Sequence, residues 1–151
     1  MKILAIDPGT LFSGFIIWDG QQILDYGKID NFQMLEYVAI RNYDVCVIER
    51  IASYGMAIGE TTLETIFWSG RFYQSAYNAD KRVERFLRKD VKLELCGQSR
   101  AKDANIIQAL KDRFEPTLEA HKKPTGLLKG ITKDVWQALA LAVVYNDLKN
   151  K

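Results

Sequence analysis

The stretch ILAIDPGT at residues 3–10 decides the fold of this chain, because it joins a short apolar run to an acid and a Pro-Gly turn. An apolar run of this length with a turn behind it predicts a buried strand that ends at Asp7. A second apolar run follows from Phe12 to Trp18 and predicts the next strand. A carboxylate fixed at the end of a buried strand is typical of a site for a cation or a phosphate.

Outward from this strand, the apolar periodicity predicts an α/β fold. The expected strands are 2–7, 12–19, 22–29, 43–48 and 91–96. The expected helices are 32–41, 60–78, 102–114 and 131–149. The charged segment 80–90 is expected to continue or cap a solvated helix, and 115–130 to form an irregular connection. Hairpin strands followed by strands that alternate with helices favour one mixed five-stranded sheet with helices on both faces. Ligands of such sheets bind near the carboxyl ends of strands.

The helix expected at 60–78 carries apolar residues at helical spacing, which predicts a stripe that faces the core. The members of this stripe are Leu63, Ile66, Phe67, Gly70, Tyr73 and Tyr77. Trp68 and Phe72 lie beyond the stripe and, together with Tyr73, are candidates for a dimer contact.

Length and composition indicate a single globular domain over residues 1–151, with 48% hydrophobic and 26% charged residues. No uninterrupted apolar run is long enough for a membrane span, and the N-terminus lacks the succession of a signal peptide. The expected location is the cytoplasm. Cys46 and Cys96 both fall in expected strands and are interpreted as reduced core thiols, with a disulfide as the alternative.

The net charge of +2 divides unevenly along the chain. Residues 1–65 hold four Lys/Arg and nine Asp/Glu, whereas residues 66–151 hold 17 Lys/Arg and ten Asp/Glu. An acidic half beside a basic half suits a protein that binds cations and a polyanion together. Chance scatter of charges over a solvated surface is the alternative.

Two further acids make Asp7 a candidate site. Glu49 follows the strand expected at 43–48, and Asp134 lies in the first turn of the last helix, where the helix dipole favours a carboxylate. Acids from separate elements are what a pair of divalent cations needs to hydrolyse a phosphodiester. Each acid also has a plainer interpretation: Asp7 forms the turn, Glu49 pairs with Arg50 or another neighbour, and Asp134 caps its helix.

Three motifs in the same order and spacing resemble the RuvC family of Holliday junction resolvases, which are ribonuclease-H-like nucleases. They are IDPGT at residues 6–10, VIER at 47–50 and DVWQALA at 134–140. The segments IASYGM at 51–56 and AKDANI at 101–106 look more like the RuvC-like proteins of bacteriophages and prophages. For a phage-encoded protein, the expected location is the cytoplasm of the bacterial host.

The resemblance implies a homodimer that cuts four-way DNA junctions symmetrically, with two Mg²⁺ or Mn²⁺ ions per site and no nucleotide cofactor. It implies that Asp7, Glu49 and Asp134 are metal-binding acids. The cellular pattern has another acid three residues beyond Asp134, and this chain has Gln137 there. An amide oxygen ligates a hard cation without adding charge. Asp103 is the alternative fourth ligand, or else an ordinary first-turn helix acid.

Basic and polar residues near these motifs are candidates for binding DNA. The resemblance places Lys102 near the scissile phosphate, and an aromatic in the loop after Glu49 against the bases of the junction. The full candidate set is Ser53, Tyr54, Arg100, Lys102, Lys122, Lys123, Lys129 and Lys133. Solvated loop lysines, and a tyrosine in the core or at a dimer contact, are the alternatives.

Three rival functions are consistent with parts of the sequence. The missing fourth acid suits a branched-DNA-binding protein of the same fold with weak or no cleavage activity. The IDPGT strand also resembles the phosphate loop of actin-like and sugar-kinase-like ATPases, although those enzymes enclose a nucleotide with a duplicated domain. A regulatory or RNA-directed relative of the same fold is the third, because fold alone does not choose a substrate.

Overall fold

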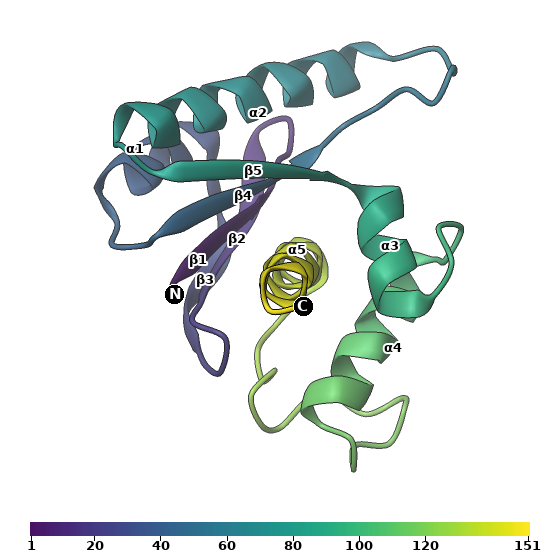
Figure 1. Ribbon diagram of the computed structural model, residues 1–151. Helices are drawn as coiled ribbons and strands as arrows, with labels where there is room; N and C mark the ends of the chain where they lie inside the picture. The colour runs from purple at the N-terminus through teal and green to yellow at the C-terminus, as the bar shows by residue number, and fades with distance from the viewer.

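The computed structural model describes residues 1–151 as one mixed sheet with helices on both faces (Figure 1). The strands are β1 (Ile3–Asp7), β2 (Phe12–Trp18), β3 (Ile23–Asp30), β4 (Val45–Arg50) and β5 (Arg82–Leu87). The helices are α1 (Asn31–Ile40), α2 (Glu60–Asn78), α3 (Arg88–Cys96), α4 (Asp103–Phe114) and α5 (Lys133–Lys149). The predicted α/β class and five-stranded sheet are confirmed.

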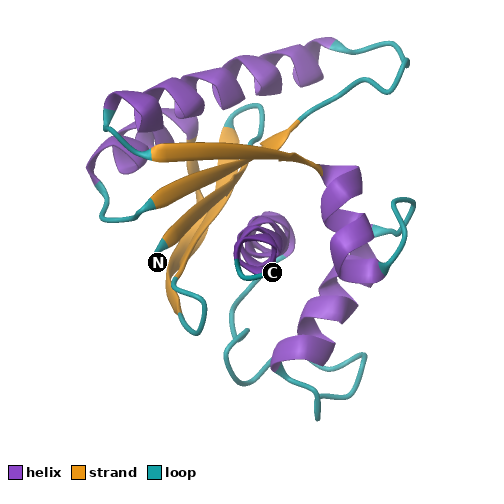
Figure 2. Cartoon of the chain, in the orientation of Figure 1, coloured by secondary structure: helices purple, strands orange, loops and turns teal.

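The strand order is β3-β2-β1-β4-β5, with β1 antiparallel to β2 and parallel to β4. Helices α1 and α2 cover one face, and α5 packs against the other, with α3 and α4 beyond one edge of the sheet (Figure 2). No helix has the length and apolar character that crossing a membrane requires.

Side chains alternate between the two faces along each strand, and this alternation sets up the site. On β1, Ile3 and Ala5 pack into the core beneath α5, whereas Leu4 and Ile6 pack toward α1 and α2. By the same alternation, Asp7 projects on the α5 face. Val45 and Val47 on β4 also face α5, so Glu49 projects on that face beside Asp7.

Two adjoining expectations were wrong, because the fifth strand is β5 at Arg82–Leu87 and the segment expected as a strand at 91–96 belongs to α3. β5 is an edge strand, and its charged residues suit an edge, where charge discourages pairing with another chain. Its apolar residues are divided between the two cores, with Val83 toward α2 and Phe86 toward α5. The strand was therefore not predicted, because its charged residues obscure the alternation of its apolar ones. Cys96 consequently lies in a helix, although both cysteines are free as predicted.

The apolar stripe predicted to face the core on α2 is mostly exposed. Trp68, Phe72 and Ala76 form the buried face instead. Leu63 and Phe67 of the predicted stripe are 56% and 58% exposed. Helix α2 thus carries apolar residues on two sides, and the sheet and α1 cover one of them. The same finding removes Trp68 and Phe72 as candidates for a dimer contact.

Candidate active site

Asp7 and Glu49 lie side by side at the carboxyl ends of neighbouring parallel strands. The register that pairs Ile6 with Ile48 carries both acids to the same end and the same face of the sheet. Each is 8% exposed, so two carboxylates are buried next to each other. Because burying charge without a partner is costly, this pair requires a cation or a proton.

Burial, and then the charge of Glu49, raise the pKa of Asp7 to about 8. A hydrogen bond with Glu49 and the charge of Asp134 act in the same direction, whereas Arg88 opposes them. A carboxylate that retains its proton up to neutral pH, next to other acids, is typical of a functional site. Two positive charges brought between these acids would favour the ionised form.

In this structure the partner of both buried acids is Arg88, the first residue of α3. Its Nε donates to Glu49 Oε1 at 2.5 Å and its Nη2 donates to Glu49 Oε2 at 3.3 Å. The same Nη2 lies 3.4 Å from Asp7 Oδ1. Nη1 lies 3.5 Å from Asp103 Oδ2, so one guanidinium contacts three carboxylates. The ion pair considered for Glu49 therefore exists, with Arg88 rather than Arg50.

Asp134 approaches Asp7 from the start of α5, and a glycine makes this approach possible. Gly14 lies opposite Asp7 in the β1–β2 register. A Cβ on Gly14 would lie 2.7 Å from Asp134 Cβ and 2.9 Å from its carbonyl carbon. Asp7 and Asp134 line one cavity of about 260 Å³ together with Lys28, whose Nζ lies 2.7 Å from Asp134 Oδ2.

A buried polar network holds the turn after Asp7. Ser13 and Asn31 are almost fully buried, and the Ser13 hydroxyl donates to Asn31 Oδ1 at 2.6 Å. The Gly9 N–H donates to Ser13 Oγ, and Asn31 Nδ2 donates to the Gly9 carbonyl at 2.9 Å. These bonds satisfy buried polar groups and fix the backbone beside the acid. Sequence reasoning missed this network, because its two side chains are 18 residues apart.

The donor set fits a hard divalent cation, although no three ligating side chains form a ready cluster in this structure. Asp7, Glu49 and Asp134 supply the oxygen ligands that Mg²⁺ prefers. In place of a metal, Arg88 pairs with Asp7 and Glu49, and Lys28 pairs with Asp134. Asp103 reaches the same Arg88. Gln137 is half-buried one turn beyond Asp134 and does not line the cavity that Asp7 and Asp134 share.

Tyr54, one of the predicted DNA-binding residues, lies beside Glu49. It lines one cavity with Glu49 and Arg88, is 57% exposed, and has a left-handed backbone with φ of 51°. Lys89 Nζ lies 5.5 Å from the centre of its ring. Ser53 is half-buried, and its hydroxyl accepts from the Gly55 N–H.

The predicted basic residues are all exposed, and none contacts the acids. Lys102 is the N-cap of α4, with Arg100 two residues before it. Lys133 begins α5 beside Asp134. The connection that carries the other lysines is held by Glu115, which accepts from three backbone N–H groups. The three lysines on this connection are Lys122, Lys123 and Lys129.

With this geometry in view, comparison with solved structures defines the fold. The structure of Thermus thermophilus RuvC superposes with a TM-score of 0.73 at 15% identity, over 99% of this chain and 96% of that one. T. thermophilus RuvC in complex with a Holliday junction substrate gives a TM-score of 0.71 at 16% identity, over 99% of this chain and 94% of that one. No family model and no curated protein matches the sequence.

The chain therefore has the ribonuclease-H-like fold in the form found in RuvC. The resemblance that the three sequence motifs indicated is confirmed at the level of the fold.

Proposed function

We propose that this protein is a divalent-metal-dependent endonuclease that cuts four-way DNA junctions. The burial of Asp7 and Glu49 side by side, with Asp134 brought in by α5, carries the proposal. The fold supports it, because RuvC of the same architecture has been seen with a Holliday junction substrate. The basic C-terminal part of the chain suits the phosphate backbone of such a substrate.

Asp7, Glu49 and Asp134 would hold Mg²⁺ or Mn²⁺. When bound, a pair of such ions activates a water and stabilises the leaving oxygen of a phosphodiester. The candidates for a fourth ligand are Gln137, one turn beyond Asp134, and Asp103, which contacts the same guanidinium as the buried acids.

The remaining candidate residues would bind and orient the DNA. Lys102 and Arg100 stand at the N-terminus of α4, where a phosphate is favoured by the helix dipole. Tyr54 is exposed beside Glu49, and stacking on a base is worth roughly 1–3 kcal/mol. Ser53 fixes the turn that carries Tyr54. Lysines at 122, 123, 129 and 133 would contact backbone phosphates farther from the cut.

A cleavage panel tests the proposal. A four-way junction, a fork and a linear duplex are each incubated with Mg²⁺, with Mn²⁺ or with EDTA. We expect cleavage of the junction with either metal, little cleavage of the duplex, and none in EDTA. Cleavage that persists in EDTA would contradict the metal-dependent mechanism.

The second candidate function is a branched-DNA-binding protein with weak or no cleavage. The observation that favours it is that each of the three acids pairs with Arg88 or Lys28. Tight junction binding without a single nick in either metal would establish this function in place of the first.

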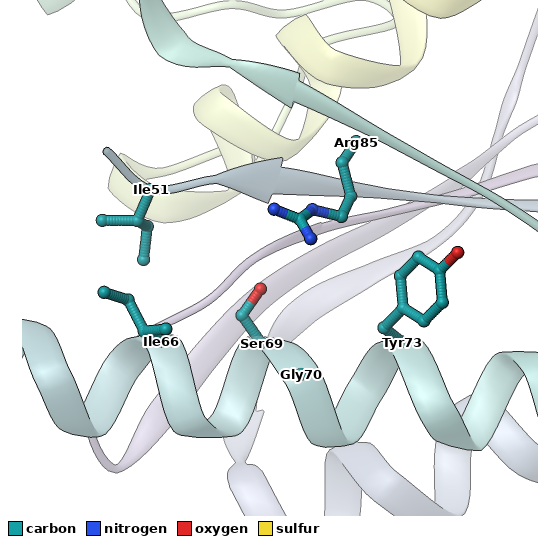
Figure 3. Close-up of a pocket in the computed structure, with 6 residues that line it drawn as sticks. All are labelled: Ile51, Ile66, Ser69, Gly70, Tyr73 and Arg85. Atoms are coloured by element: carbon teal, nitrogen blue, oxygen red, sulfur yellow. The ribbon is translucent and has the colours of Figure 1, made fainter. Parts of the chain in front are cut away.

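We also propose that the protein is a homodimer formed through α2. A two-fold symmetric junction needs two equivalent sites, and a two-fold dimer supplies them. The exposed side of α2 is apolar, and beside it lies a cavity of about 240 Å³ between α2 and the strands (Figure 3). The cavity is lined by Ile51, Ile66, Ser69, Gly70, Tyr73 and Arg85. Exposed apolar patches of this kind mark interaction sites.

Phe67→Glu is expected to convert a dimer into a monomer. Phe67 is 58% exposed, so the substitution leaves the core intact but places a charge in the proposed apolar interface. We expect the dimer dissociation constant to rise by at least about 100-fold in sedimentation experiments. Leu93→Glu is the control, because Leu93 is 53% exposed on α3. A native protein that sediments as a monomer at all concentrations would contradict the proposal.

A further inference from the structure

Arg88 occupies the place between the two buried acids that a metal ion would take. Its Nε and Nη2 engage both oxygens of Glu49, and Nη2 also reaches Asp7 Oδ1 at 3.4 Å. No other basic side chain pairs with either acid. An arginine guanidinium is not deprotonated in proteins, whatever its surroundings. The guanidinium is therefore a permanent cation at this position.

A divalent ion and this guanidinium compete for the same oxygens. The guanidinium donates to both oxygens of Glu49 and lies 3.4 Å from Asp7 Oδ1, so a divalent ion at these oxygens would overlap its N–H groups and meet its positive charge. If Arg88 stayed in place, the free oxygens of Asp7 and Glu49 would not be available together to a metal. Metal binding at these two acids thus requires Arg88 to move.

Asp103 offers the guanidinium a partner other than the two buried acids. Nη1 of Arg88 already lies 3.5 Å from Asp103, which is exposed at the first turn of α4 and also lies 3.7 Å from Lys92. The Arg88 side chain is 35% exposed, so it is not locked by packing. Rotation of the side chain alone can release the buried acids while an ion pair with Asp103 is kept.

We propose that Arg88 is an internal cation that closes the metal site: it bridges Asp7 and Glu49 in the metal-free protein, and a divalent ion binds by displacing it toward Asp103. The proposal rests on the proposed function, in which Asp7 and Glu49 hold the metal. It makes Arg88 a positioning residue that keeps the acids together without metal and lowers the apparent affinity for metal. The apparent affinity falls in proportion to the fraction of molecules in which the site is open.

The test is direct Mn²⁺ binding to the full chain without DNA, followed by the electron paramagnetic resonance signal of free Mn²⁺. Arg88→Gln removes the charge and keeps a polar side chain of similar reach. We expect the dissociation constant for Mn²⁺ to fall by at least about tenfold in this variant. Arg88→Lys keeps the charge without the two-pronged contact, and we expect an affinity between those of the native protein and Arg88→Gln.

Arg85→Gln is the matched control. It removes one positive charge from β5, the strand that precedes Arg88, but its side chain lies toward α2 and not toward the acids (Figure 3). We expect its affinity for Mn²⁺ to stay within about twofold of the native value, because the charge it removes is far less coupled to the site. Thermal unfolding with and without Mn²⁺ gives a second readout, in which Arg88→Gln should show the lower melting temperature in EDTA and the larger rise on addition of Mn²⁺.

The outcomes separate this inference from the proposed function. Equal or weaker Mn²⁺ binding by Arg88→Gln, with clear binding by the native protein, would overturn the role of Arg88 and leave the metal site standing. Absence of Mn²⁺ binding in the native protein and in every variant would overturn the metal site itself. If Arg88→Gln does not fold, Arg88→Lys decides the question: affinity no tighter than native overturns the inference.

Discussion

Replacing Asp7 by asparagine is expected to lower the rate of metal-dependent junction cleavage by about 10³-fold or more, while junction affinity stays within a few-fold of native. Asparagine has nearly the shape of aspartate but cannot supply the negative charge that two cations share. Asp7 is also the central acid, since it interacts with both Glu49 and Asp134. Single-turnover cleavage and gel-shift binding measure the two effects separately. Undiminished cutting by Asp7→Asn would remove the main hypothesis.

The same variant is expected to be more stable than the native protein in EDTA at pH 8. Burial and Glu49 raise the pKa of Asp7 to about 8, above its unfolded value of 3.8. Between these two values the folded state holds a proton that the unfolded state has lost, so stability falls as the pH rises from about 4 to about 8. Asparagine has no proton to lose. Its advantage in free energy of unfolding should therefore grow with pH, by at most about 1.4 kcal/mol per unit.

Urea unfolding at several pH values checks this expectation. The quantity to compare is the difference between Asp7→Asn and the native protein, because pH effects from other groups cancel in it. A difference that stays constant from pH 5 to pH 8 would show that the folded state does not hold the extra proton on Asp7. Greater stability with lost cleavage is the usual relation between a strained site and its function.

The positions of Asp7 and Glu49 at strand ends were predictable, because a short apolar run followed by an acid is a local pattern. Asp7 ends an apolar run, and Glu49 ends another, so a parallel pairing of β1 and β4 was enough to bring them together. Asp134 was predictable from the sequence pattern as a first-turn acid, whereas its approach to Asp7 was implied only by the family resemblance. That approach depends on Gly14 of β2, and nothing in the spacing of residues 14 and 134 indicates a contact.

The parts that the sequence did not reveal are those decided by tertiary competition. Segment 82–87 is dense in charge, yet it pairs with β4 as an edge strand, and this pairing places Arg88 beside Glu49. Helix α2 offers two apolar sides, and its sequence does not say which side the sheet covers. In both cases the local sequence is compatible with two structures, and tertiary packing determines which one forms.

Gly14→Ala is expected to disable the site while leaving every acid in the sequence. The new Cβ would lie 2.7 Å from Asp134 Cβ and 2.9 Å from its carbonyl carbon and oxygen. These atoms belong to the start of α5 and cannot rotate away, so the helix must shift from the sheet. Overpacking of this kind costs about 1–3 kcal/mol, and each kcal/mol lowers the melting temperature of a domain of this size by about 2–4 °C.

The shift also moves Asp134 away from Asp7, so we expect Gly14→Ala to lower the cleavage rate by at least about tenfold at temperatures where the variant is folded. Gly59→Ala is the control, because nothing lies within 4 Å of its added Cβ; Gly59 is the N-cap of α2, and replacing it by alanine should cost no more than about 1 kcal/mol. Full activity in Gly14→Ala would show that Asp134 need not stay close to Asp7. Asp7→Asn removes an acid, whereas Gly14→Ala retains Asp7, Glu49 and Asp134. A loss of cleavage in folded Gly14→Ala would therefore show that the chemistry depends on how closely α5 packs against β2.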